Sequence, residues 1–179
     1  MPYYTGKGDQ GFTDTMGKGR LPKNCILFDA IGDVDELNSA VGLALYYSRE
    51  GMVRSELKLI QNDLFIIGAH VASSRAAGIE KANLKESAIS RLGRATDDLG
   101  RRIPQLKKFV LPSGCEAAVH LHVARAIARR AERSVFAASK KNKIDEDVKS
   151  YLNRLSSYLF VAAIYSNYTS GVKESHPTY

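Results

Sequence analysis

The sequence predicts an all-α protein, an antiparallel five-helix bundle with a glycine-rich arm at its N-terminus. Beyond residue 28, apolar residues recur at spacings of three and four, which is the period of an amphipathic helix. The alternation typical of strands is almost absent, and the breaks between periodic segments are short. A length of 179 residues suits one domain. We expect the arm to cover residues 1–28 and the bundle to cover residues 29–179.

The arm is predicted from its composition. It holds five of the chain's 14 glycines and shows little periodicity. Glycine favours turns over regular structure because it adopts positive φ without strain. Within this segment, only Cys25-Ile26-Leu27-Phe28 is expected to form a short extended stretch.

The first expected helix follows Phe28. Its first turns are rich in acidic residues, which the helix dipole favours at that end. The apolar face of this helix is formed by Val34, Leu37, Val41 and Leu45, and the acidic residues are Asp29, Asp33, Asp35 and Glu36.

Four more helices are expected. Pro104 ends the third, and Ser113 is expected to cap the N-terminus of the fourth, which runs to about Ser139. The polar residues 140–143 separate the fourth helix from the fifth. The apolar faces are Leu57, Ile60, Leu64, Ile67 and Val71 in the second helix; Ile89, Leu92, Leu99 and Ile103 in the third; His120, Val123, Ala124, Ile127, Ala131 and Val135 in the fourth; and Val148, Leu152, Leu155, Leu159 and Ala162 in the fifth.

Composition limits the classes of protein. With 44% hydrophobic and 25% charged residues, the chain can form a core, and disorder is not expected. The net charge of +7 suits an anionic partner without saying which kind. Two cysteines exclude a disulfide scaffold and a four-cysteine zinc site. We see neither a signal peptide nor an apolar run of about 20 residues, so a cytoplasmic protein without a membrane partner is expected.

The metal and nucleophile chemistry common in helical proteins is not indicated. Di-iron bundles use a Glu three residues before a His, and no such pair occurs here. His120 and His122 are two residues apart on one helix, so they point to different faces and suit structural roles. Cys115 lies near a helix start, but no His and Asp form a recognisable triad with it. We therefore expect no protein-bound metal and no protein nucleophile.

The stretch from Thr5 to Thr13 is the most unusual part of the sequence. Its glycines let successive backbone N–H groups converge on an anion, and Lys7 adds a positive charge. Gly6 and Gly11 have the spacing of a P-loop, but Phe12 stands where that motif needs lysine. From residue chemistry alone, a phosphate-binding arm and a flexible arm with incidental turns remain equally open.

An arginine-rich face is predicted on the fourth helix. Arg125, Arg129, Glu132 and Phe136 fall within about 60° of one another around the axis. Residues 110–143 carry a net charge of +5 and residues 29–50 carry −4, so these helices can meet within or between subunits. Arginine suits bidentate contacts to phosphate or carboxylate. We therefore favour a polyphosphate site or an interface on the fourth helix over a solvated basic face. On the fifth helix, Asn153 alone is weak evidence of a ligand site.

Together these motifs resemble the PduO-type ATP:cob(I)alamin (corrinoid) adenosyltransferases. The shared parts occur in order, at family spacing, over nearly the whole chain. They are Thr5-Gly6-Lys7-Gly8-Asp9-Gln10-Gly11; Arg20-Leu21-Pro22-Lys23; Gly32-Asp33-Val34-Asp35-Glu36-Leu37-Asn38; Phe109-Val110-Leu111-Pro112-Ser113-Gly114; Cys115 to Arg133; and Tyr151-Leu152-Asn153-Arg154-Leu155-Ser156. In the arm, the lysine is displaced by one residue from the family's usual Thr-(Lys or Arg)-Thr-Gly-Asp.

The resemblance implies a fold, an assembly and a reaction. The fold is a five-helix bundle, assembled as a homotrimer with active sites between adjacent subunits. In the reaction, the cobalt(I) of a reduced corrinoid attacks the 5′ carbon of ATP, giving adenosylcobalamin and triphosphate, and Mg²⁺ accompanies the nucleotide. Because the cobalt is the nucleophile, the protein needs no nucleophile of its own.

The resemblance also assigns roles to residues. Asp35 and Arg125 look like the family's intersubunit ion pair, and Phe109 looks like the aromatic residue that covers the lower face of the corrin. Residues of the arm would surround the phosphates, and residues of the fourth and fifth helices would line the nucleotide. These nucleotide residues are Thr5, Gly6, Lys7, Gly8, Thr13, Asp14 and Lys23 from the arm and Arg129, Arg130, Ala131, Glu132, Arg133 and Asn153 from the helices.

Two other functions remain alternatives at this point. A basic helical nucleic-acid-binding module would use the same arginines, although no aromatic residues are interleaved with them for base stacking. A non-catalytic ATP-binding bundle would share every nucleotide residue and would lack only the corrin site. The expected partners are ATP and reduced cobalamin, without nucleic acid.

Overall fold

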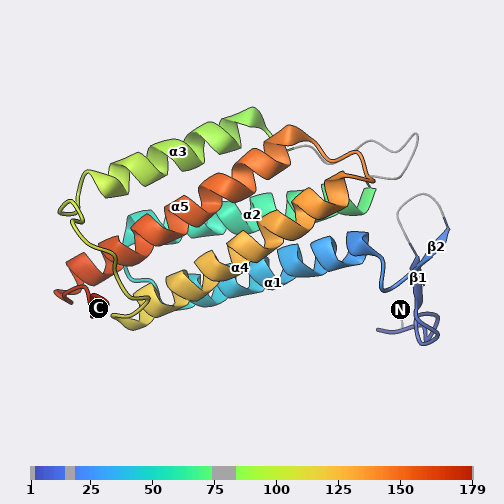
Figure 1. Ribbon diagram of the computed structural model, residues 1–179, viewed down its shortest axis with the longest axis horizontal. Coiled ribbons are helices and arrows are strands. Elements are labelled where there is room, and N and C mark those ends of the chain that lie inside the picture. Colours follow the sequence, from blue (N-terminus) through green and yellow to red (C-terminus); the bar gives the residue numbers. More distant parts are fainter. Residues whose placement is uncertain (1–2, 15–18, 74–83, 179) are drawn as a thin grey trace.

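The computed structural model describes residues 3–14, 19–73 and 84–178 and confirms the five helices (Figure 1). Their order along the chain follows the expected order. The helices are α1 (Ile26–Tyr47), α2 (Gly51–Ser73), α3 (Glu86–Gly100), α4 (Glu116–Ser139) and α5 (Glu146–Thr169). None of them, within the described segments, is long and apolar enough to cross a bilayer.

The bundle is built around α1, α4 and α5. Helix α1 packs against α2 and α4, α4 packs against α5, and α5 packs against α3. Small side chains allow the close approach of α4, because Ala124, Ala128 and Ala131 are completely buried. Val123, which the sequence predicts on the apolar face of the fourth helix, is instead exposed. The core face of α4 is therefore formed mainly by alanines.

Three helix boundaries differ from the prediction. Helix α1 begins at Ile26, so the expected extended stretch over 25–28 is wrong: Leu27 is fully buried and continues the apolar face. Helix α4 is capped by the extended residue Cys115 and not by Ser113. Helix α3 ends at Gly100, before Ile103.

The arm contains a small sheet that the sequence did not indicate. Strands β1 (Phe12–Asp14) and β2 (Arg20–Pro22) pair antiparallel, with Thr13 opposite Leu21. Tight turns precede β1: the amide of Asp9 donates to the carbonyl of Gly6 at 3.2 Å, and Gly6 has φ 67°. Figure 1 shows the arm projecting from the end of the bundle where α1 begins and α4 ends.

A polar cluster fastens α3 to α2 and α5. Arg91 on α3 pairs with Glu56 at 2.9 Å and with Asp63, both on α2. The hydroxyl of Tyr151 on α5 donates to Asp63 at 2.8 Å. Both carboxylates are buried, so this single guanidinium compensates two charges removed from water.

Candidate functional site

The arginine face of α4 lines a pocket of about 420 Å³ with the start of α5. Its cations outnumber its one carboxylate, so it suits an anion. Asn153 Nδ2 donates to Glu132 Oε1 at 2.9 Å, and Arg133 Nη1 donates to the carbonyl of Arg129 at 2.9 Å. The lining residues are Arg129, Glu132, Arg133, Phe136, Ala137, Lys140 and Asn153.

Arg129 is the residue of this pocket best placed to bind an anion. Its side chain is exposed and makes no hydrogen bond or ion pair with any described residue. A guanidinium in that state can offer a pair of N–H donors to one phosphate. The hydrogen bond between Asn153 and Glu132 joins the α4 and α5 sides of the pocket.

Two residues of the expected nucleotide site lie elsewhere. Arg130 turns toward α1: its Nε donates to Asp33 Oδ1 at 3.1 Å, and its Nη2 pairs with Glu36. Ala131 is completely buried in the core, so its predicted place beside the nucleotide is corrected. On a helix, successive residues point about 100° apart, so the five consecutive residues 129–133 cannot all face a single pocket.

Asp35 and Arg125 do not pair within the chain. Asp35 is exposed on α1. Arg125 is half-buried on α4, and its Nε is buried without a hydrogen-bond partner among the described residues. His122, one turn before Arg125, is also buried, and neither of its ring nitrogens has a partner there. Burial, followed by the charge of Arg125, lowers the pKa of His122 to about 4, so its ring is neutral at pH 7.

The expected phosphate-binding residues of the arm lie close together. Arg20 on β2 connects the turn before β1 to the two-stranded sheet. Its Nη2 donates to the carbonyl of Lys7 and, at 3.4 Å, to the carbonyl of Phe12. Its Nε lies 3.9 Å from Oδ1 of Asp14. The amide of Lys23 donates to the carbonyl of Gly11 at 2.8 Å. Arg20 had no predicted role, although it begins one of the shared motifs. Thr5, Gly6, Thr13 and Asp14 belong to the same folded arm.

The side chain of Lys23 also limits the space beside Gly8. A Cβ on Gly8 would lie 3.1 Å from the Nζ of Lys23, so the lysine reaches across the loop. None of the hydrogen bonds or ion pairs made by the described residues Thr5 to Asp14 reaches α4 or α5. No described residue of the arm lines the α4 pocket either, so the arm and the pocket do not form one site within a single chain.

Phe109 is 80% exposed on the loop between α3 and α4. The C-terminal tail holds this loop, because His176 Nδ1 lies 2.8 Å from the carbonyl of Phe109 and the amide of Leu111 donates to the carbonyl of Ser175 at 2.8 Å. Phe109 borders a hollow shared with Leu106, Lys107, Lys108, His176 and Pro177.

Asn167 on α5 connects the same loop to the tail. Its Oδ1 accepts from the amide of Cys115 at 2.9 Å, and its Nδ2 donates to the carbonyl of Ser113 at 3.0 Å and to Glu174 at 3.1 Å. Asn167 is fully buried. Sequence reasoning missed it; the available signal was an amide placed among the apolar residues of the last helix.

Known proteins are similar to this chain in both sequence and fold. The family model described as cobalamin adenosyltransferase matches residues 3–166. The corrinoid adenosyltransferase of Bacillus subtilis is 42% identical over 176 residues, which cover 96% of this chain and 90% of that protein. The human corrinoid adenosyltransferase MMAB is 38% identical over 177 residues, which cover 96% of this chain and 71% of that protein.

Solved structures agree with these relatives. A variant of the PduO-type ATP:corrinoid adenosyltransferase from Lactobacillus reuteri, complexed with cobalamin and ATP, superposes with a TM-score of 0.94 at 36% identity. The superposition covers 99% of this chain and 100% of that one. By the family model, the sequence identity and the shared fold, this protein belongs to the PduO-type cobalamin adenosyltransferase family.

Proposed function

We propose that this chain transfers the 5′-deoxyadenosyl group of ATP to the cobalt(I) of a reduced corrinoid. The cobalt electron pair forms the bond to the 5′ carbon, and the bond from that carbon to the phosphate oxygen breaks. Triphosphate leaves with the electron pair of the broken bond, and cobalt becomes formally cobalt(III). The observation that carries the proposal is the α4 pocket with its unpaired arginine, in a chain of this family.

The α4 pocket is the proposed nucleotide site. Arg129 and Arg133 would bind the triphosphate, whose negative charge grows as the bond breaks. Glu132 and Asn153, already hydrogen-bonded to each other, would face the adenosine. Arg130 would act indirectly, by fixing α4 against α1 through Asp33 and Glu36.

The arm, expected over residues 1–28, is proposed to close over the phosphates; its last three residues, 26–28, belong to α1, so only the part before Ile26 is distinct from the bundle. The backbone N–H groups from Thr5 to Gly8 would converge on phosphate oxygens, and Lys7 and Lys23 would add positive charge. The donor set also fits Mg²⁺ carried by ATP, because Thr13 and Asp14 offer exposed or half-exposed oxygen ligands. Bound there, Mg²⁺ would neutralise charge on the triphosphate.

A homotrimer with composite sites is proposed because one chain leaves its α1 and α4 surfaces incomplete. Leu43 and Tyr46 on α1 and Val119 and Val123 on α4 are exposed apolar side chains. Tyr46 packs edge-on against Tyr47, which stacks on His120, so these side chains form one patch across the two helices. A second copy would cover this patch.

The polar groups of the same surface support this assembly. Asp35 is exposed, and the Nε of Arg125 lacks a partner among the described residues. Their pairing across the interface would satisfy both groups. It would also bring the arm of one subunit to the α4 pocket of the next.

Phe109 is proposed to lie against the lower face of the corrin. An apolar ring in that position would keep a lower axial ligand off the cobalt, which would leave the metal four-coordinate and easier to reduce. The backbone of the loop that carries Phe109 is held by Asn167 and by the tail, which fixes the point from which the exposed ring projects.

The direct test is anaerobic incubation with ATP and chemically reduced cobalamin. Visible absorbance should change to that of the cobalt–carbon product, and triphosphate should form in equal amount. ATP bound without any product would instead show a binding protein, and salt-sensitive binding of nucleic acid without turnover would show a nucleic-acid module.

A further inference from the structure

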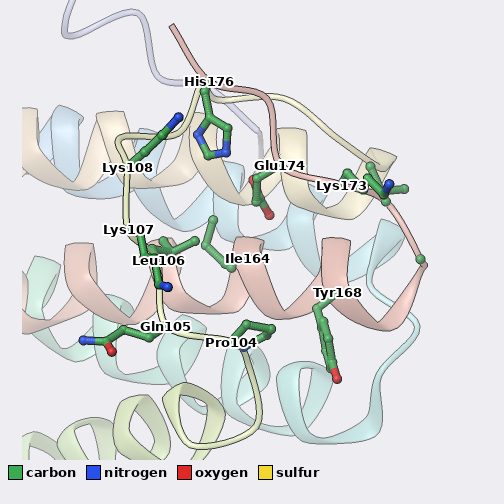
Figure 2. Close-up of a pocket in the computed structure, with 12 residues that line it drawn as sticks. Pro104, Gln105, Leu106, Lys107, Lys108, Ile164, Tyr168, Lys173, Glu174 and His176 are labelled. Carbon is green, nitrogen blue, oxygen red and sulfur yellow. The ribbon is translucent and has the colours of Figure 1, made fainter.

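A second cavity lies behind the Phe109 loop. It has a volume of about 640 Å³, is open to solvent, and is lined by the loop residues 104–108, the last turns of α5 and the C-terminal tail (Figure 2). It shares Leu106, Lys107, Lys108 and His176 with the hollow beside Phe109, so the two spaces adjoin. A volume of this size suits a small organic group.

The walls of this cavity combine an apolar interior with a cationic rim. Pro104, Ile164 and Tyr168 contribute apolar surface, and the ring of Tyr168 is half exposed. The rim carries Lys107, Lys108 and Lys173, and the lysine side chains have no ion-pair partner among the described residues (Figure 2). This combination fits a flat aromatic base attached to an anion.

One acidic residue lines the cavity, and it offers a hydrogen bond. Glu174 Oε1 accepts from Asn167, whereas Glu174 Oε2 is buried and accepts no hydrogen bond from a described residue. An incoming hydroxyl group would satisfy this oxygen. The three lysines outweigh the carboxylate, so the cavity keeps a positive balance.

We propose that this cavity binds the lower nucleotide of a complete corrinoid, which is an aromatic base joined to the corrin through a ribose phosphodiester. The inference rests on the proposed function, in which Phe109 occupies the place of the lower axial ligand. A base displaced by Phe109 stays tethered on that side of the corrin, and this cavity adjoins the hollow beside Phe109. Tyr168 receives the base, the lysines receive the phosphodiester, and Glu174 receives a ribose hydroxyl.

The walls of the cavity are already in place, so a corrinoid with a lower nucleotide can gain contacts there that a corrinoid without one cannot. The bonds from His176 to Phe109 and from Leu111 to Ser175 fix the loop against the tail at the mouth of the cavity. Binding therefore does not require the wall to be ordered first. The enzyme is expected to favour cobalamin over cobinamide, the corrinoid that lacks the lower nucleotide.

The test compares these two corrinoids in wild type and in the double variant Tyr168→Ala/Lys173→Ala. Both substituted residues line this cavity and not the hollow beside Phe109. The variant should raise the KM for reduced cobalamin about tenfold, as expected for loss of one stacking and one ionic contact. Its KM for cobinamide and for ATP should stay within about twofold of wild type. Lys58→Ala, on the exposed face of α2, is the matched control and should change neither corrinoid's KM.

The outcomes separate this inference from the function on which it rests. Equal KM values for the two corrinoids in wild type, or an equal rise for both in the variant, would overturn the nucleotide site alone. Adenosylation of neither corrinoid by wild type would overturn the proposed function and the inference with it. Should the double variant fail to fold, Lys173→Glu tests the same contact by reversing the charge, and it should raise the KM only for cobalamin.

Discussion

At the scale of residues, the arginines of α4 differ in what they contact. Arg129 faces the pocket without a partner among the described residues, Arg130 is paired with α1, and Arg133 donates to a backbone carbonyl. An unpaired guanidinium can offer all of its N–H donors to a phosphate, whereas a paired one offers only the donors that its partners leave free. Neighbouring arginines therefore have unequal expected roles.

Arg129→Ala is expected to lower kcat/KM for adenosylation by about a hundredfold or more, because a charge-stabilising donor is lost. Helix content and assembly should not change, since the side chain is exposed. Arg94→Ala, an exposed arginine of α3, is the control and should retain full activity. Steady-state kinetics and analytical ultracentrifugation make the comparison, and loss of assembly in Arg129→Ala would show a structural role instead.

We expect the free energy of unfolding to depend on pH through His122. Its pKa is lowered in the folded chain to about 4 by burial and by Arg125, whereas the unfolded chain keeps a value near 6.5. Below pH 6.5 the unfolded state binds the extra proton, so stability should fall between pH 6.5 and pH 4, by about 3 kcal/mol at most. Urea unfolding of wild type and His122→Gln across this range tests the point. An unchanged slope in the variant would show that other groups cause the dependence.

At the scale of elements, two polar junctions fix the positions of the helices relative to one another. One is Asn167, which joins α5 to the start of α4 and to the tail. The other is Arg91, which joins α3 to α2. The Arg91 junction lies between α2 and α3, which otherwise pack together little.

The first junction depends on a glycine. Gly114 has φ 128°, and a Cβ there would lie 1.9 Å from Asn167 Oδ1. Gly114→Ala is therefore expected to reduce the unfolding free energy by about 3 kcal/mol or more, through backbone strain and displacement of the buried amide. Gly93→Ala, inside α3 with nothing within 4 Å of its Cβ, should stabilise by about 0.5–1 kcal/mol. Urea unfolding measures both, and equal effects would contradict this account.

The second junction is tested by Arg91→Met. The change leaves Glu56 and Asp63 buried without their cation, so the unfolding free energy should fall by about 3 kcal/mol. Arg94→Met on the same helix makes no such contact and should alter it by less than about 0.5 kcal/mol. Thermal and urea unfolding give the comparison. A small loss for Arg91→Met would show that packing alone holds α3.

At the scale of the whole molecule, the exposed patch across α1 and α4 is the surface through which we propose that the trimer forms. Val123→Glu is expected to yield monomers with normal helix content and almost no turnover, because a charge would be buried between subunits. Leu59→Glu on α2 places the same charge at a similarly exposed apolar residue and should remain trimeric. Sedimentation velocity separates these outcomes, and a trimeric Val123→Glu would place the interface elsewhere.

The sequence by itself determined the five helices, because their apolar faces repeat with a local period that the helix geometry sets. It also placed Arg129, Glu132 and Arg133 on one helix with Asn153 on the next, since the arginine motif and the last helix are both legible as patterns. The short sheet of the arm was not predicted because three-residue strands carry too little alternation to be recognised.

Only the tertiary structure decided which polar groups are already paired. Arg130 and Arg129 are adjacent and chemically identical, and they differ only because Asp33 and Glu36 stand beside one of them. Asn167, Arg91 and His176 acquire their roles from partners in distant parts of the chain. Helical period is a property of neighbouring residues, whereas the partner of a polar atom depends on how whole helices pack, and no local pattern encodes that.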